Sequence, residues 1–134
     1  IRRFEDYGVA IDEVIACGGI AEKNPLVMQM YADVTGKEMK IARSAQTCAL
    51  GAAMAGAVAA GRKGDGHETF AEAQAAMGGI KRTSYKPNAA NHKVYLELYG
   101  LYRELHDAFG TKEWNGGLHN VMKDLLAVKD RQRR

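Results

Sequence analysis

The feature that most constrains this chain is a pair of adjacent glycines between a strand pattern and a helix start. Residues 13–16 are typical of a short buried strand, and Gly18 and Gly19 follow them closely. Asn24 and Pro25 then mark a helix opening, with Asn at the N-cap and Pro at the first helical position. Because glycine lacks a Cβ and tolerates positive φ, the backbone N–H groups here can approach a phosphate or a sugar ring. The alternative interpretation of the glycine pair is a tight strand-to-helix turn without a ligand.

The segments that follow the glycines alternate between helix and strand patterns. Residues 26–36 form an amphipathic pattern that ends at Gly36, residues 38–42 alternate as a strand does, and residues 47–56 open a further helix. This order predicts an α/β layer structure with helices flanking a sheet. Only two strands are clear, and a two-stranded sheet is a poor independent unit. We therefore expect strands upstream of Ile1 to complete the sheet.

The second half of the chain has clear helix signals. Thr69 is the expected N-cap of a helix over residues 70–77, which Gly78 and Gly79 close. Since these two glycines follow a helix, we assign them a structural role and no ligand. A long helix is predicted over residues 89–109. Its expected packed face consists of Val94, Leu98, Leu101, Leu105 and Phe109.

The helix that opens at residue 47 is rich in Ala and Gly. Such small side chains allow a helix to lie close to a sheet or to another helix. From this pattern we expect Gly51→Leu to overpack the contact, at a cost of about 1–3 kcal/mol.

Charge and cysteine content limit the function classes. The net charge is only +3, and Lys and Arg are interleaved with Asp and Glu, which argues against a nucleic-acid surface. Cys17 and Cys48 lie in apolar parts of the chain without a CxxC partner, so we expect two reduced, mostly buried thiols in the cytoplasm. The four histidines lack metal-ligand spacing, and no protein-held metal is predicted. We expect no signal peptide, and the apolar run over residues 48–60 is too short to cross a bilayer.

Residues 14–61 as a whole resemble the C-terminal signature of the FGGY carbohydrate kinases. The shared motifs are the Gly-Gly turn, Ala-Asp-Val-x-Gly at residues 32–36, a short strand, and Ala-Leu-Gly-Ala-Ala at residues 49–53. Residues 16–25, 40–53 and 110–115 are similar to the members of the family that act on L-ribulose. The resemblance implies the C-terminal part of an actin-like, ribonuclease-H-like kinase domain. Residues 1–134 would then be a C-terminal fragment of the second, nucleotide-binding domain, with residues 111–134 as a tail segment.

The reaction implied by the resemblance is ATP-dependent phosphorylation of a ketopentose, L-ribulose to L-ribulose 5-phosphate, as in L-arabinose catabolism, with Mg²⁺ as the usual cofactor. By the same resemblance, Gly18 and Gly19 match the glycines at the α-phosphate and ribose of ATP. Ala21 and Asn24 match the turn beside the adenine. The family's catalytic aspartate, phosphate loop and sugar contacts lie upstream of this sequence, so no catalytic residue is assigned, and the fragment alone is expected to be inactive. Asp33, near a helix end, is expected to have a structural role.

The expected partners are ATP and a sugar, with no nucleic acid and no membrane, and a homo-oligomer is left open. Two other functions remain open at this point. One is an FGGY kinase for xylulose, glycerol or another polyol. The other is a non-catalytic helical interaction module, suggested by the Tyr-striped long helix and the charged C-terminus. A dinucleotide-binding fold is disfavoured because the sequence contains no GxGxxG.

Overall fold

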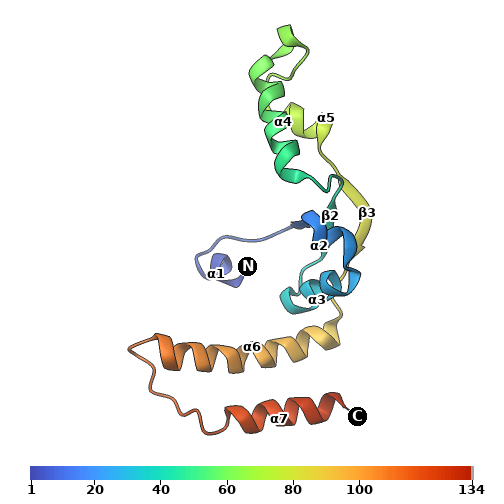
Figure 1. Cartoon of the computed structure of the whole chain (residues 1–134). Coiled ribbons are helices and arrows are strands. Elements are labelled where there is room, and N and C mark those ends of the chain that lie inside the picture. Colours follow the sequence, from blue (N-terminus) through green and yellow to red (C-terminus); the bar gives the residue numbers. More distant parts are fainter. Residues whose placement is uncertain (134) are drawn as a thin grey trace. The chain divides into compact units, whose positions relative to one another are not determined.

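The computed structural model describes residues 1–133 of the chain. These residues form two units, Ile1–Pro87 and a second unit that begins at Asn88. Each unit has its own arrangement of elements (Figure 1).

The first unit is built on a three-stranded mixed sheet. Its strands are β1 (Val14–Ala16), β2 (Met39–Ala42) and β3 (Ile80–Tyr85), in the order β1-β2-β3. β1 runs parallel to β2, with Ala16 opposite Ile41, and β3 runs antiparallel to β2, with Ala42 opposite Ile80. The sheet confirms the predicted α/β class and both predicted strands.

Two consecutive helices connect β1 to β2 and cover one face of the sheet. They are α2 (Gly18–Lys23) and α3 (Pro25–Thr35), and Gly36 ends α3 with the left-handed φ of 67°. Met39 and Ile41 alternate toward these helices, as the period of a strand requires. The buried core therefore lies between α2, α3 and β2. It consists of Ala21, Met28, Ala32, Met39 and Ile41.

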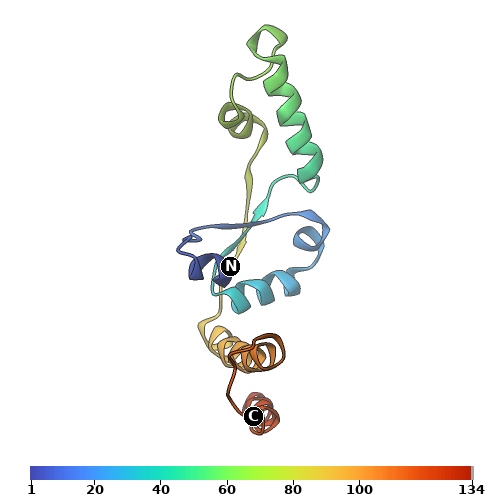
Figure 2. The same ribbon diagram turned by 90° about the vertical axis from the view of Figure 1, so that its left-hand side faces the viewer.

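Two further helices lie beyond the end of β2. α4 (Thr47–Ala60) and α5 (Phe70–Met77) contact each other and are joined through a 3-10 turn, η1 (Arg62–Gly64) (Figures 1 and 2). The unit also contains a short N-terminal helix, α1 (Arg2–Asp6).

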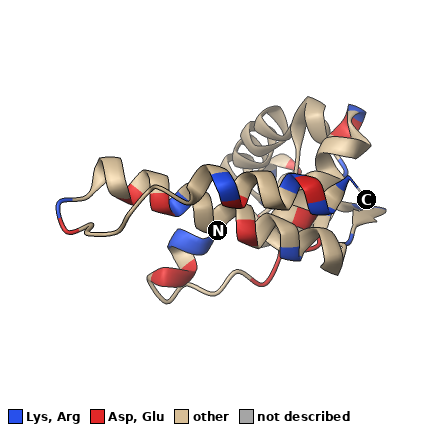
Figure 3. Ribbon diagram, turned by 90° about the horizontal axis from the view of Figure 1, so that it is seen from below, with Lys and Arg blue, Asp and Glu red and all other residues tan. Residues whose placement is uncertain are grey.

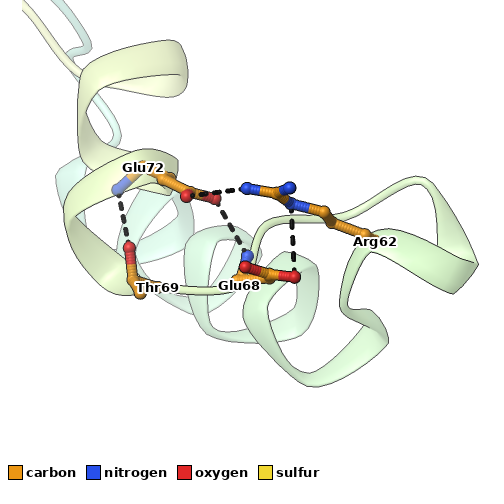
Figure 4. A network of polar contacts seen from close by, with 4 residues as sticks. All are labelled: Arg62, Glu68, Thr69 and Glu72. Atoms are coloured by element: carbon orange, nitrogen blue, oxygen red, sulfur yellow. Dashed lines mark hydrogen bonds and ion pairs between the residues drawn. The ribbon is translucent and has the colours of Figure 1, made fainter.

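The start of α5 is held by a small polar network. Thr69 is the N-cap, as predicted, and its hydroxyl accepts a hydrogen bond from the Glu72 backbone N–H at 3.2 Å. The Glu72 carboxylate accepts from the backbone N–H of Glu68 at 3.1 Å and pairs with the Arg62 guanidinium at 3.2 Å (Figure 4). Arg62 also pairs with Glu68 at 3.4 Å. The network therefore joins η1 to the first turn of α5.

Three expectations about the first unit are corrected. β3 was not predicted, because its sequence, Ile-Lys-Arg-Thr-Ser-Tyr, lacks the apolar alternation of a half-buried strand. Cys17 and Cys48 are free, as expected, but exposed rather than buried. Cys17 is the N-cap residue of α2, and Cys48 lies in the first turn of α4. A Cβ on Gly51 meets nothing within 4 Å, so the predicted overpacking by Gly51→Leu is wrong. The reason is that α4 buries none of its residues.

The second unit is a pair of antiparallel helices, α6 (Ala89–Gly110) and α7 (Val121–Gln132) (Figure 1). The Asn88 side chain caps α6 by accepting from the N–H groups of Ala90 and Asn91. Four of the predicted packed-face residues are half-buried, but Phe109 is 84% exposed at the last turn, so its assignment to that face is wrong. Acidic and basic residues alternate along the helices (Figure 3), and Arg131 pairs with Glu97. Among the described residues, no helix has both the length and the apolar character needed to span a membrane.

Candidate functional site

Three chain junctions meet at one edge of the sheet in the first unit. The parallel pairing of Ala16 with Ile41 brings the carboxyl ends of β1 and β2 to the same edge, and the pairing of Ala42 with Ile80 adds the start of β3. We call this the carboxyl edge, formed by residues 17–19, 43–46 and 78–79. In open α/β sheets, ligands bind outside the carboxyl ends of the parallel strands. The carboxyl edge is therefore the candidate functional site.

The first glycine pair lies at this edge and begins α2. Gly18 has φ +84°, a conformation that L side chains rarely adopt, whereas the φ of Gly19 is not positive. A Cβ built on either glycine meets nothing within 4 Å, so the backbone here faces open space. The first N–H groups of a helix have no partner within that helix. This turn therefore has both the room and the donors for an anionic group.

Of the other two predicted site residues, Ala21 is buried and Asn24 is exposed. Ala21 is only 7% exposed and belongs to the core against α3 and β2. Asn24 is the N-cap of α3, as predicted, and its Oδ1 accepts from the Val27 N–H at 3.1 Å. The structure thus brings Gly18 and Gly19 to the open edge, while the Ala21 methyl and the Asn24 Oδ1 have structural partners. Asp33 is also buried, and it accepts a hydrogen bond from Gln29 Nε2 at 2.8 Å, which fits the structural role expected for it.

An ion pair that the sequence did not suggest links α2 to β3. Lys81 Nζ donates to both carboxylate oxygens of Glu22, at 2.6 and 2.5 Å. The two residues are 59 positions apart in the sequence, so no local pattern could have connected them.

The second glycine pair at this edge has structural reasons for its composition. A Cβ on Gly78 would lie 2.5 Å from the Gln74 carbonyl oxygen, and one on Gly79 would lie 3.1 Å from the Arg43 guanidinium. Arg43 in turn donates from its side chain to the Gly78 carbonyl at 2.5 Å and from its backbone N–H to the Gly79 carbonyl at 2.9 Å. A cation is favourable at the carboxyl end of a helix such as α5. The structural role predicted for Gly78 and Gly79 is confirmed.

A cleft of about 700 Å³ lies between the uncovered face of the sheet and the α4–α5 pair. Its lining is mainly apolar and includes Ile15, Met54, Phe70 and Ile80, but not Gly18 or Gly19. Glu13 also lines it and accepts a hydrogen bond from Lys40 at 2.5 Å. This hydrogen bond, together with the charge of Glu13, raises the pKa of Lys40 above its ordinary value. Within residues 1–133 no group of three or more His, Cys, Asp or Glu side chains is placed to hold a metal ion.

Comparison with known proteins relates this geometry to a family. Residues 1–60 match the model of the C-terminal domain of the FGGY family of carbohydrate kinases. The chain is 47% identical to a ribulokinase of Geobacillus thermodenitrificans, over 99% of the chain and 23% of that protein. It is 48% identical to a ribulokinase of Bacillus licheniformis, over 98% of the chain and 23% of that protein. It is 43% identical to a ribulokinase of Mycolicibacterium smegmatis, over 82% of the chain and 19% of that protein. The chain thus spans about a quarter of the length of these relatives or less.

Proposed function

This chain belongs to the FGGY family of carbohydrate kinases, and from this premise we propose that the protein transfers a phosphoryl group from ATP to a ketopentose. The proposed reaction is L-ribulose to L-ribulose 5-phosphate, with this chain supplying part of the ATP site. The observation that carries the proposal is the 47% identity to a ribulokinase over 99% of the chain. That similarity extends through both units, well beyond the residues of the family signature.

The proposed place for ATP is the carboxyl edge. We assign its phosphate and ribose side to Gly18 and Gly19, because both glycines face open space and Gly18 has φ +84°. Backbone donors at the start of α2 suit an anionic ligand. Ala21 and Asn24 are proposed to lie beside the adenine. The Ala21 methyl anchors this part of α2 in the core, and the Asn24 Oδ1 fixes the start of α3.

ATP brings the phosphoryl group that is transferred, and the work of this chain is to bind and orient it. Catalysis of phosphoryl transfer rests mainly on positioning and on electrostatic stabilisation. Mg²⁺ is the usual partner of ATP in such enzymes, but the described residues offer no cluster of ligands for it, so we assign no metal contact to this chain. We also assign no proton acceptor and no sugar contact within it.

The cytoplasm is the proposed location of the protein. Cys17 and Cys48 are both free and exposed, and exposed free thiols persist best in a reducing compartment.

A comparison of sugars tests the proposed substrate. We expect the intact protein to show a higher kcat/KM for L-ribulose than for D-xylulose or glycerol, with ATP as donor. A polar site that hydrogen-bonds the hydroxyl groups of its substrate loses binding energy for each hydroxyl that is missing, and glycerol has too few hydroxyl groups to fill such a site. A clear preference for D-xylulose or glycerol would leave the family assignment intact and overturn the ribulose assignment. Absence of transfer to any sugar would overturn the kinase proposal itself.

A further inference from the structure

The helix that carries the glycine turn has few attachments to the rest of the first unit. α2 is six residues long, and Ala21 is its one buried residue. Ile20 is 56% exposed, and the N-cap residue, Cys17, makes no side-chain capping hydrogen bond. The orientation of α2 must therefore depend on a small number of contacts.

The Glu22–Lys81 ion pair is one of these contacts. The Lys81 ammonium is shared by both oxygens of the Glu22 carboxylate, at 2.6 and 2.5 Å. The Glu22 side chain is 22% exposed and the Lys81 side chain is 36% exposed. Partial burial reduces the screening by water that makes fully exposed ion pairs weak. This pair therefore restrains α2 more than a solvated surface pair would.

The ion pair also lies near the proposed ATP site. Lys81 follows Ile80, the register partner of Ala42, so it lies two residues from Gly79 of the carboxyl edge. Glu22 is four positions from Gly18, which is about one turn along the same helix. A shift of Glu22 would therefore be transmitted along a rigid turn of helix to the glycine backbone.

We infer that Glu22 and Lys81 are positioning residues for ATP, which hold α2 so that the Gly18–Gly19 backbone faces the nucleotide. This inference rests on the proposed function. The pair acts through α2 and does not itself touch the reacting atoms. Small displacements of a positioning group weaken its effect strongly. Loss of the ion pair should therefore weaken the binding of ATP more than the binding of the sugar.

The test is steady-state kinetics of the intact protein with Lys81→Met and Glu22→Gln. Each variant is expected to raise the KM for ATP about fivefold, equivalent to about 1 kcal/mol, and to change the KM for L-ribulose by less than about twofold. The double variant should be no worse than either single variant, because both changes remove one interaction. Lys81→Arg should restore most of the ATP affinity, since a guanidinium can also contact both carboxylate oxygens.

Lys37→Met is the matched control. Lys37 pairs with Glu5 at 3.0 Å and has a 34% exposed side chain, close to that of Lys81, but it precedes β2 at the opposite edge of the sheet. We expect the KM for ATP of the Lys37→Met protein to stay within about twofold of that of the unmodified protein, because a surface ion pair contributes little free energy.

The outcomes separate this inference from the proposed function. An unmodified protein that transfers no phosphate from ATP to a sugar refutes the proposed function. Normal activity combined with an unchanged KM for ATP in folded Lys81→Met refutes the positioning role alone. Equal rises in KM for ATP and L-ribulose would also refute it, because they indicate a general structural effect. If Lys81→Met does not fold, Glu22→Gln and Lys81→Arg decide by the same criteria.

Discussion

At the scale of single residues, the two glycines at the start of α2 have different constraints. Gly18 needs its conformational freedom for the fold, because its φ is +84°, and a side chain there costs about 1–2 kcal/mol in left-handed backbone strain. Gly19 has no such φ and has open space where its Cβ would be. The described fold therefore gives no steric reason for a glycine at position 19. Because Gly19 lies at the carboxyl edge, we propose that its role is to allow close approach of a ligand.

This difference gives a specific prediction for Gly19→Val. The intact protein should remain folded, while its affinity for ATP falls by about tenfold or more, because a branched side chain blocks approach to the backbone at a cost of at least about 1.4 kcal/mol. The KM for L-ribulose should change far less. Titration calorimetry with ATP measures the effect.

Gly56→Val is the control for that experiment. Gly56 is also helical and also has nothing within 4 Å of its Cβ position, but it lies in α4. Its ATP affinity should match that of the unmodified protein. Unchanged ATP affinity in folded Gly19→Val would remove Gly19 from the proposed site.

At the scale of elements, the Glu72 carboxylate holds the start of α5 through its contacts with Glu68 and Arg62. The hydrogen bond from the Glu68 backbone N–H lowers the pKa of Glu72 below its ordinary value of 4.5, and the neighbouring Arg62 adds to this (Figure 4). A carboxylate whose pKa is lower in the folded state stabilises that state above its unfolded pKa. The stabilisation disappears as the pH falls from 4.5 through the lower, folded value.

We therefore predict that Glu72→Gln weakens α5 at neutral pH but not in acid. Amide hydrogen exchange should show lower protection of α5 in this variant at neutral pH, and the difference from the unmodified protein should vanish well below pH 4.5. Thr69→Val is the control, because loss of the hydroxyl cap costs about 1 kcal/mol at any pH. A difference that persists in acid would show that Glu72 stabilises α5 without its charge.

The elements that could be predicted from the sequence are those with local signals. Asn24 and Thr69 each mark a helix start through a side-chain cap, and both predicted caps are present. β3 was not predicted because its sequence includes the charged Lys81, which pairs with Glu22 of α2, a helix far away in the sequence. The glycine turn of the candidate site could be read from the sequence for the same local reason. The attachment of α2 to β3 could not, because it depends on tertiary contact.

Exposure was the property that sequence patterns predicted least well. Small residues in α4 suggested close packing, yet Gly51 and Gly56 have open space around their Cβ positions. An apolar or small-residue pattern indicates that a face is able to pack, whereas burial also requires a partner surface. α4 contacts α5, which leaves most of its small residues exposed.

At the scale of the whole molecule, phosphoryl transfer needs more groups than this chain is proposed to supply. We have assigned it part of the ATP site, but neither a proton acceptor nor a sugar site, and its 134 residues correspond to 23% of the length of the similar ribulokinases. Alignment of donor and acceptor makes up much of the catalytic effect in kinases, and closure around both substrates excludes water. A chain that binds only one of the two substrates cannot provide that alignment.

We therefore predict that the 134-residue chain alone catalyses no transfer from ATP to L-ribulose in the presence of Mg²⁺. The measurement is L-ribulose 5-phosphate formation by the purified chain, compared with a blank and with the intact protein. The Gly18→Val form of the same chain controls for contaminating kinase, because a contaminant's activity would be identical in both preparations. Product that exceeds the blank and is lost in the Gly18→Val form would mean that the missing proton acceptor and sugar site lie within these residues after all.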